Sequence, residues 1–357
     1  MGCHSQIGIP QNLWEIPLFD VRSPGEFAAG HIPAALSLPL FSDLERAEVG
    51  TLYKQVSQKI AFERGLEFAS SRLDEMLREV RHRAGQATHV RVMCWRGGMR
   101  SQSVCWMLRQ AGIEAEVLTG GYKSWRRALL KLFALPWSLC ALGGPTGAGK
   151  TDLLKELGEA GEQVLDLEHL ASHRGSAWGH LGKNPQPSQE HFENLIGAAL
   201  ASCSPERVLW IEDESRMIGR CKIPDALFKQ LLCAPLLLLE SPLQERIGRL
   251  LAEYGPFPQE QQVAVTQSLQ KRLGSQACAR CIEYIQQGEL RLACEILMQY
   301  YDVSYQHALK RSKRPCVSLD RSSPEFVEEV LQHGRSLQER SQPVASQLEE
   351  GAVLSGV

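Results

Sequence analysis

The segment from Gly144 to Thr151, GPTGAGKT, restricts the fold more than any other part of the chain. It fits the pattern G-x-x-x-x-G-K-[ST] in full, after the apolar run SLCAL and before the helical pattern TDLLKELGEAG. A strand, a glycine-rich loop and a helix in this order form a P-loop, whose backbone N–H groups hold phosphates. We expect Lys150 to neutralise the terminal phosphates and Thr151 to reach Mg²⁺. The predicted phosphate-binding residues are Gly144, Thr146, Gly147, Ala148, Gly149, Lys150 and Thr151.

Polar residues that follow the P-loop supply further candidate contacts. The apolar pattern RVLWIED ends at Glu212 and Asp213, which we take as candidate Mg²⁺ ligands beside Thr151. The alternative is a solvated strand end. We expect no intrinsic metal site, because no third ligand accompanies the one helical histidine pair and no second pair accompanies the one CxxC. The candidate substrate contacts of the loop HRGS are His173, Arg174 and Ser176.

A second anion-binding pattern lies earlier in the chain. The apolar run HVRVM leads into CWRGGMRS, and the helical pattern SQSVCWMLRQAG follows. Two glycines let successive N–H groups turn inward, arginines add positive charge and the helix adds its dipole, so the site favours a cysteine thiolate. The alternative is an ordinary buried cysteine at a strand end. The predicted catalytic residues are Cys94, Arg96 and Arg100, and the predicted anion-loop residues are Trp95, Gly97, Gly98 and Met99.

The order of apolar runs predicts an α/β fold with two parallel-sheet domains. A chain of 357 residues with 43% hydrophobic residues has room for two cores. Short apolar runs alternate with helical segments in the first half, which also holds a helical insert at about Ser42–Ala84. We predict a first domain at residues 1–132, a P-loop domain at 137–325 and a disordered tail at 335–357.

Two segments of the first domain resemble the signatures of the rhodanese family. FDVRSPGEFAAGHIPAALSLPL, Phe19 to Leu40, is similar to the opening signature, and LTGGYKSWRR, Leu118 to Arg127, to the closing one. The resemblance implies an N-terminal rhodanese-like parallel-sheet domain followed by a P-loop NTPase-like α/β domain, with a sulfur-carrying cysteine at Cys94. Five residues separate Cys94 from Arg100. This is also the spacing of cysteine-dependent phosphatases, and it suggests a donor that carries a phosphate.

Both patterns on one chain resemble the tRNA 2-selenouridine synthase family. The blocks that carry the resemblance are CWRGGMRSQS, LTGGYKSWRR, GPTGAGKT, HLASHRGS, EDESRMIG and YYDVSY. The resemblance implies a transferase that converts the wobble 2-thiouridine of tRNA to 2-selenouridine with selenophosphate. It further implies an S-geranylated intermediate made from geranyl diphosphate. The implied partners are therefore the anticodon region of tRNA, selenophosphate and geranyl diphosphate, with optional Mg²⁺ and no tightly bound cofactor.

A tRNA-binding enzyme needs local positive charge, because the net charge of the chain is −2. The segment HALKRSKRP supplies it close to the tyrosines of YYDVSY, which offer aromatic rings for bases. The alternative is a solvated helix end. The candidate tRNA contacts are Lys310, Arg311, Lys313 and Arg314.

Cysteine usage and the distribution of apolar residues indicate where in the cell the protein is located. The eleven cysteines are odd in number and scattered, which indicates reduced thiols. No apolar run approaches the roughly 20 residues that span a bilayer, and the first residues lack the pattern of a signal peptide. We expect a cytoplasmic protein without membrane contact. Three other functions stay open: a persulfide sulfurtransferase coupled to an ATP-dependent P-loop module, a cysteine phosphatase fused to a kinase-like domain, and a nucleotide sensor with an inert rhodanese fold.

Overall fold

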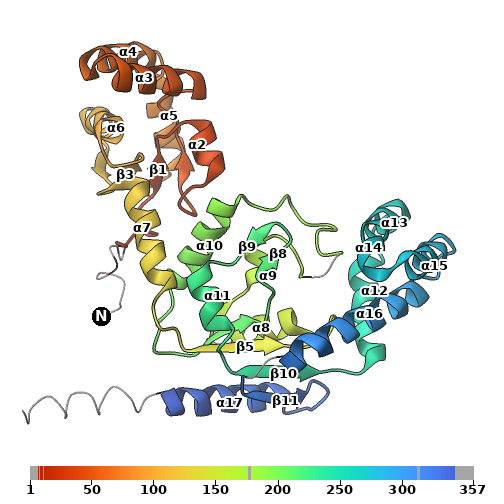
Figure 1. The fold of residues 1–357 in the computed structure, drawn as a ribbon. Coiled ribbons are helices and arrows are strands. Elements are labelled where there is room, and N and C mark those ends of the chain that lie inside the picture. The colour runs from red at the N-terminus through yellow and green to blue at the C-terminus, as the bar shows by residue number, and fades with distance from the viewer. Residues whose placement is uncertain (1–6, 8, 11, 176–177, 312–313, 342–357) are drawn as a thin grey trace, which may run out of the picture. The chain divides into compact units, whose positions relative to one another are not determined.

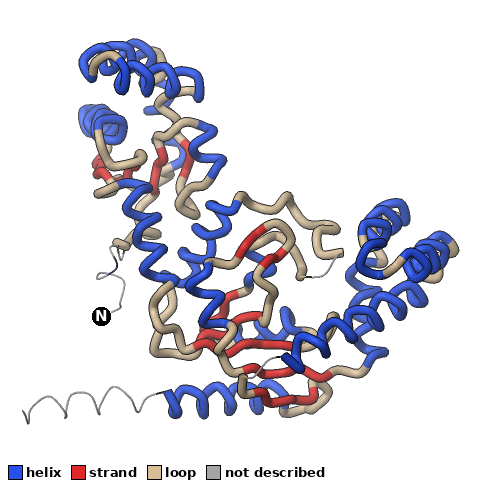
Figure 2. The backbone as a smooth tube through the Cα atoms, viewed as in Figure 1, coloured by secondary structure: helices blue, strands red, loops and turns tan. Residues whose placement is uncertain are grey.

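The computed structural model describes residues 7, 9–10, 12–175, 178–311 and 314–341. These residues form two compact units (Figure 1). The first unit contains residues 1–134 and 188–202, and the second contains 135–187 and 203–357. The chain therefore passes between the units three times, after residues 134, 187 and 202. Figure 2 shows short strands (red) enclosed by helices (blue).

The first unit is built on a four-stranded parallel sheet with the order β2-β1-β3-β4. Its central strands are buried on both faces, as expected where helices cover a parallel sheet. Since parallel strands end at one edge, the residues that follow β1 and β3 meet there. The strands are β1 (Leu18–Asp20), β2 (Leu36–Ser37), β3 (His89–Met93) and β4 (Glu114–Val117).

Helices cover this sheet and include the predicted insert. Residues 42–84 form three helices, of which α3 begins after a capping box made by Ser42 and Glu45. A buried cluster that includes Phe19, Val80 and Leu108 joins the sheet to α5 and α6. The helices of this unit are α2 (Pro24–Ala29), α3 (Asp43–Gln55), α4 (Gln58–Ser70), α5 (Leu73–Arg83), α6 (Met99–Gln110), α7 (Gly121–Phe133) and α10 (Gln189–Ala201).

Helix α10 belongs to the first unit although the predicted P-loop domain contains its sequence. It packs against α7 through a buried polar network centred on Asn194. The Asn194 amide oxygen accepts hydrogen bonds from Trp125 Nε1 and Arg126 Nη1, both at 3.0 Å. Its amide nitrogen donates to the Tyr122 hydroxyl at 2.7 Å and to the His31 carbonyl at 2.9 Å. The predicted first domain at residues 1–132 therefore leaves out helix α10, which belongs to the same compact unit.

The second unit contains a five-stranded parallel sheet with the order β11-β10-β5-β7-β6. The strand that leads into the P-loop, β5, is central, with later strands on both sides. In such sheets ligands bind beyond the carboxyl ends of the strands where the order reverses. The strands are β5 (Leu139–Gly143), β6 (Gln163–Leu165), β7 (Leu209–Glu212), β10 (Leu236–Glu240) and β11 (Cys316–Asp320), with a separate antiparallel pair, β8 (Met217–Ile218) and β9 (Cys221–Lys222).

Two buried clusters join several helices of the second unit. One, around Trp210, joins the sheet to α8 and α17, and the other, around Leu297, joins α12 to α16. The α/β fold with parallel sheets is thus confirmed. None of the described helices is both long and apolar enough to cross a membrane. The helices are α8 (Lys150–Glu159), α9 (Leu167–Leu170), α11 (Asp225–Leu231), α12 (Leu243–Tyr254), α13 (Gln259–Ser268), α14 (Gln270–Leu273), α15 (Ser275–Gln286), α16 (Leu290–Arg311) and α17 (Phe326–Ser341).

The predicted disordered tail begins inside helix α17. This helix continues to Ser341, so residues 335–341 are helical rather than irregular. Val330 and Phe326 anchor the start of the helix in the core of the second unit. The rest of the predicted tail, 342–357, lies outside the described residues.

We expect Asn194→Ala to destabilise the protein. The change removes the partner of the buried Trp125 N–H and of the part-buried His31 carbonyl, and an unpaired buried group costs about 1–3 kcal/mol. The midpoint of urea denaturation, followed by tryptophan fluorescence, should fall accordingly. Glu63→Ala is the control, because Glu63 makes only an exposed pair with Lys59. Equal midpoints for the two variants would contradict the role given to Asn194.

Candidate functional site

Cys94 follows β3 and is nearly buried, with 3% of its surface exposed. Its Sγ lies 3.2 Å from the Ser101 hydroxyl oxygen, at the start of α6. Burial raises the pKa of the thiol, but hydrogen bonds from Ser101 and from the Arg96 N–H, together with the charge of Arg100, outweigh it and leave the pKa below its ordinary value. The structure therefore favours the thiolate at Cys94. Burial raises the pKa of every other described cysteine that shows a shift, for example that of Cys105 to about 11.

The N-terminus of α7 holds the cysteine loop from behind. The N–H of Tyr122 donates to the Cys94 carbonyl at 3.0 Å, and the N–H of Lys123 donates to the Trp95 carbonyl at 2.9 Å. Gly121 has φ +56°, and a Cβ there would lie 2.3 Å from the Cys94 carbonyl oxygen. The close approach explains the glycine in LTGGYKSWRR. On the other side of the loop, the N–H groups of Arg96 and Ser101 are within hydrogen-bonding reach of the Cys94 sulfur.

Glu26 positions Arg100, a role that the sequence analysis missed. Its carboxylate accepts from Arg100 Nη1 at 2.9 Å and also closes the capping box of α2 with Ser23. Arg46 of the inserted helix α3 pairs with the same carboxylate at 3.4 Å. Burial alone would raise the Glu26 pKa, but Arg100, Ser23 and Arg46 lower it to about 2. A charged Glu26 thus holds Arg100 beside the loop at all physiological pH values.

The remaining residues of the loop are arranged around its mouth. Arg96 is exposed, Met99 is 50% exposed and Trp95 is 38% exposed, with its ring 5.7 Å from that of Tyr122. Gly97 has φ +68°, and Gly98 is the N-cap of α6. All seven predicted residues of this site therefore lie together at the carboxyl end of β3. Their catalytic roles stay predictions.

We expect Glu26→Ala to slow alkylation of Cys94 at pH 7 by about threefold, because Arg100 loses the carboxylate that holds it near the thiolate. Iodoacetamide labelling of the Cys94 peptide across pH, quantified by mass spectrometry, measures this effect as a rise of the thiol pKa. Glu26→Gln should restore part of the rate, since its amide oxygen still accepts from Arg100.

The control for this experiment is Glu48→Ala on α3. Glu48 pairs with Arg64 at 2.7 Å on the surface and should leave the pH profile unchanged. A fall of the Cys94 pKa in Glu26→Ala would mean that Arg100 stays in place without Glu26, which contradicts the positioning role.

The P-loop connects β5 to α8 as the motif predicts. Gly147 and Gly149 have φ +77° and +87°, and Lys150 Nζ donates to the Gly144 carbonyl at 3.1 Å. Side chains from other elements fix the loop. Arg249 Nη1 donates to the Gly147 carbonyl at 2.9 Å. The Gly144 N–H donates to the Tyr305 hydroxyl at 2.7 Å.

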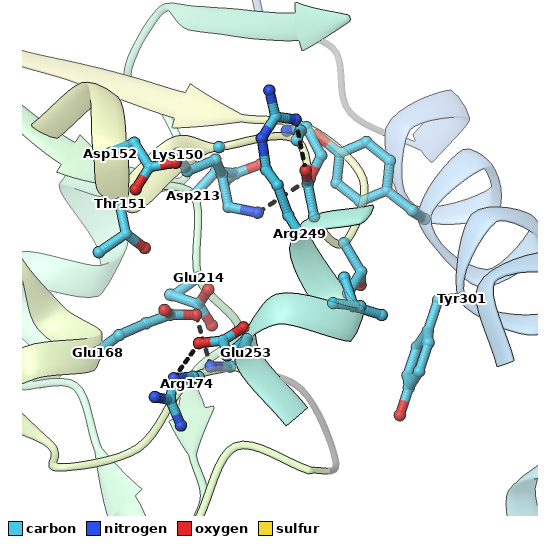
Figure 3. A pocket seen from close by; sticks show the side chains of 18 of the residues that line it. Lys150, Thr151, Asp152, Glu168, Arg174, Asp213, Glu214, Arg249, Glu253 and Tyr301 are labelled. Atoms are coloured by element: carbon cyan, nitrogen blue, oxygen red, sulfur yellow. Dashed lines mark hydrogen bonds and ion pairs between the residues drawn. The ribbon is translucent and has the colours of Figure 1, made fainter. Parts of the chain in front are cut away.

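A cavity of about 790 Å³ opens in front of the P-loop within the second unit. It is lined by the P-loop, by carboxylates and by a wall of larger side chains from α12 and α16. In Figure 3, Glu168, Glu214 and Glu253 gather around Arg174, and Arg249 lies next to Lys150. The lining also includes Asp166, His169, Lys183, Leu250, Tyr254, Tyr301 and Tyr305.

Thr151 and Glu212 lie close enough to share a cation. The Thr151 hydroxyl donates to Glu212 Oε1 at 3.5 Å, and Glu212 is fully buried at the end of β7. Burial, followed by repulsion from Glu168 and Asp166, raises the pKa of Glu212 well above its ordinary value. A buried carboxylate beside a P-loop threonine fits the ligand set of Mg²⁺. Of the two candidates after β7, Glu212 has the position for this role.

Asp213 is engaged elsewhere. Its carboxylate accepts from Arg314 Nη2 at 2.6 Å, and the Arg314 side chain is only 9% exposed. Arg314 therefore braces the end of β7 instead of offering a free charge to tRNA, contrary to the sequence-based expectation. Lys310 is exposed and Arg311 ends α16. Lys313 lies outside the described residues.

The loop HRGS lies in part at the cavity. Arg174 pairs with Glu253 and donates to the Leu181 carbonyl at 2.8 Å, so its charge is compensated within the protein. His173 is partly buried, its Nδ1 has no partner among the described residues, and burial lowers its pKa. Ser176 lies outside the described residues.

Burial and neighbouring carboxylates raise the pKa of a carboxyl group on the acidic side of the cavity. Burial, then the nearby Glu168, raises the Glu214 pKa to about 8. Glu168 also accepts from the Gly175 N–H. Among the described residues no group of three or more His, Cys, Asp or Glu side chains is arranged to hold a metal ion. The cavity therefore places Lys150 and Arg249 on one side and a carboxyl group with a raised pKa on the other.

Comparison with known proteins matches both units. A family model described as "tRNA 2-selenouridine synthase AAA domain" covers residues 137–337, and one described as "Rhodanese-like domain" covers 9–128. A tRNA 2-selenouridine synthase from Marinobacter nauticus is 39% identical over 248 residues, 68% of this chain and 66% of that protein. The one from Shewanella denitrificans is 40% identical over 67% of this chain and 65% of that protein.

The chain thus spans just under two thirds of the length of these two relatives in the matched region. A longer match is found with the tRNA 2-selenouridine synthase of Shewanella woodyi. It is 32% identical over 360 aligned residues, which cover 90% of this chain and 95% of that protein. The resemblance therefore extends through both units.

Proposed function

The chain belongs to the tRNA 2-selenouridine synthase family, and we propose from this that it exchanges the sulfur of a wobble 2-thiouridine in tRNA for selenium from selenophosphate. The exchange runs through an S-geranylated nucleoside made from geranyl diphosphate. The observation that carries the proposal is the presence on one chain of Cys94 with a lowered pKa and of a cavity lined by the P-loop, and both suit a phosphorus-centred anion.

The first step activates the sulfur as a leaving group. The thiouridine sulfur attacks C1 of geranyl diphosphate, the C–O bond breaks and pyrophosphate leaves. Lys150, Arg249 and the P-loop N–H groups stabilise the departing charge. Thr151 and Glu212 would hold Mg²⁺, which supplies further neutralisation of the pyrophosphate when bound. Leu250 and Tyr301 of the cavity wall offer apolar surface to the prenyl chain.

The second step requires a selenium nucleophile. Selenophosphate already carries selenium at the selenide level, so transfer onto Cys94 as a perselenide would need an oxidant. Attack of the Cys94 thiolate on phosphorus needs none: the S–P bond forms, the P–Se bond breaks and selenide leaves with the electron pair. Arg96, Arg100 and the loop N–H groups hold the phosphoryl oxygens.

Selenide then completes the exchange. It attacks C2 of the S-geranylated pyrimidine, and geranyl thiolate leaves. Water releases phosphate from the phosphocysteine and restores Cys94. The Ser101 hydroxyl, 3.2 Å from Sγ, stabilises the thiolate as leaving group in this last step. The five residues between Cys94 and Arg100 give room for a tetrahedral phosphate, which supports this route.

We expect Lys150→Ala and Cys94→Ala to block different steps. Lys150→Ala should lose geranylation while it still selenates tRNA that is already S-geranylated, because only the first step expels pyrophosphate. Cys94→Ala should geranylate and accumulate the S-geranylated product. Mass spectrometry of the digested nucleosides, with geranyl diphosphate and selenophosphate added separately and together, measures both steps. Loss of both steps in both variants would contradict this division, and an unchanged nucleoside with the native protein would refute the function.

The phosphoryl route makes a separate prediction about Cys94. Acid quenching of the native protein after brief mixing with selenophosphate should trap a phosphoryl group on the Cys94 peptide, detected by mass spectrometry. Cys105→Ser, a buried position with a raised pKa, should leave the label unchanged. A selenium adduct on Cys94 in place of phosphorus would show that the cysteine carries selenium.

A further inference from the structure

Large side chains surround the mouth of the cysteine loop without being buried. Trp95 is 38% exposed, Met99 is 50% exposed and Trp106 is 66% exposed. Arg96 is exposed, and Lys123 is half-buried at the start of α7. We name these five residues, Trp95, Arg96, Met99, Lys123 and Trp106, the loop rim. Exposed aromatic residues beside a reactive group indicate a surface that a partner covers.

Trp95, Met99 and Trp106 form a stripe that the exposed polar residues Gln102 and Ser103 interrupt between Met99 and Trp106. Met99 is the first residue of α6, directly after the loop that holds Cys94. Trp106 lies seven positions later, two turns along the helix and on the same face, about 10 Å from Met99 along the axis. Trp95 follows Cys94 itself and leans on Tyr122. The stripe therefore starts at the reactive sulfur and runs along α6.

Positive charge accompanies the stripe. Residues 89–134 contain eight Lys or Arg and two acidic residues, Glu114 and Glu116. Acidic groups from other elements pair with Arg91, Arg100 and Arg126. Among the described residues no ion pair is formed by Arg96 or Lys123, the two charges of the loop rim. The surface around Cys94 is thus complementary to a polyanion.

We propose that the loop rim binds single-stranded RNA, with unpaired bases stacked on Trp95 and Trp106 and phosphates held by Arg96 and Lys123. This rests on the proposed function, because it names the surface that would present the nucleoside to Cys94. Unpaired bases can stack on aromatic side chains, whereas bases inside an RNA duplex are already stacked on each other. The loop rim therefore prefers an RNA loop with unpaired bases. Since Cys94 is 3% exposed, only a base turned out of such a loop reaches it.

The binding test uses the full chain without selenophosphate or geranyl diphosphate. One probe is an anticodon stem-loop RNA with 2-thiouridine at the wobble position, and the other is the same strand closed into a continuous duplex. Trp106→Ala should lower the affinity for the stem-loop about tenfold and leave the affinity for the duplex unchanged. Lys123→Ala should lower the affinity for both probes. It should also reduce by about one the magnitude of the slope of log binding constant against log salt concentration. Tyr53→Ala, a 48% exposed aromatic on α3, is the matched control and should bind as the native chain does.

Turnover gives an independent measure. Trp106→Ala should raise KM for tRNA and leave kcat and the pH profile of Cys94 alkylation unchanged, because Trp106 does not touch the reacting atoms. The inference is overturned if Trp106→Ala binds the stem-loop like the native chain, or weakens both probes equally. It is also overturned if the variant instead changes the mass measured by light scattering, which would make the stripe an interface between copies. Normal binding by a chain that never selenates would refute the proposed function and leave the loop rim standing.

Discussion

The hydrogen bonds of Tyr122 are the contact on which the cysteine site depends. Its N–H holds the Cys94 carbonyl, its hydroxyl bonds to Glu190 and Asn194 of α10, and its ring supports the Arg22 guanidinium at 3.9 Å. One buried side chain thus joins the loop to a helix from a distant part of the sequence. Because α10 supplies both bonds to the hydroxyl, the first unit reaches its full packing only when residues 188–202 are present.

The two anion sites follow the same physical logic. In each, glycines at positive φ allow the turn, and carbonyls on its outer side are tied by other elements so that N–H groups face inward. Helix α7 ties the cysteine loop, while Arg249 and Arg246 tie the P-loop through the carbonyls of Gly147 and Thr146. Arg246 is buried and held by Asp302 of α16. The supports therefore come from residues far from either motif.

This distribution explains what the sequence predicts and what it does not. Local patterns located both loops and the α/β class, because strand, loop and helix are contiguous there. The docking of α10, the hold of Glu26 on Arg100 and the pairing of Arg314 with Asp213 involve partners 64 to 163 positions apart. A basic cluster such as 310–314 looks the same in sequence whether its charges face solvent or a buried carboxylate. Burial, which is a property of the whole fold, decides between them.

Charge separates the chemistry that the two loops support. The P-loop cavity is lined by Asp152, Glu168 and Glu253 as well as by Lys150 and Arg249. The two cations can neutralise the charge of a small diphosphate bound at the P-loop. A long polyanion would meet those carboxylates at every further phosphate. Residues 89–134 around Cys94 contain eight Lys or Arg against Glu114 and Glu116, and Glu26 is shared between Arg100 and Arg46. Electrostatics therefore favours a compact phosphate ligand in the cavity and an extended nucleic-acid ligand at the cysteine loop.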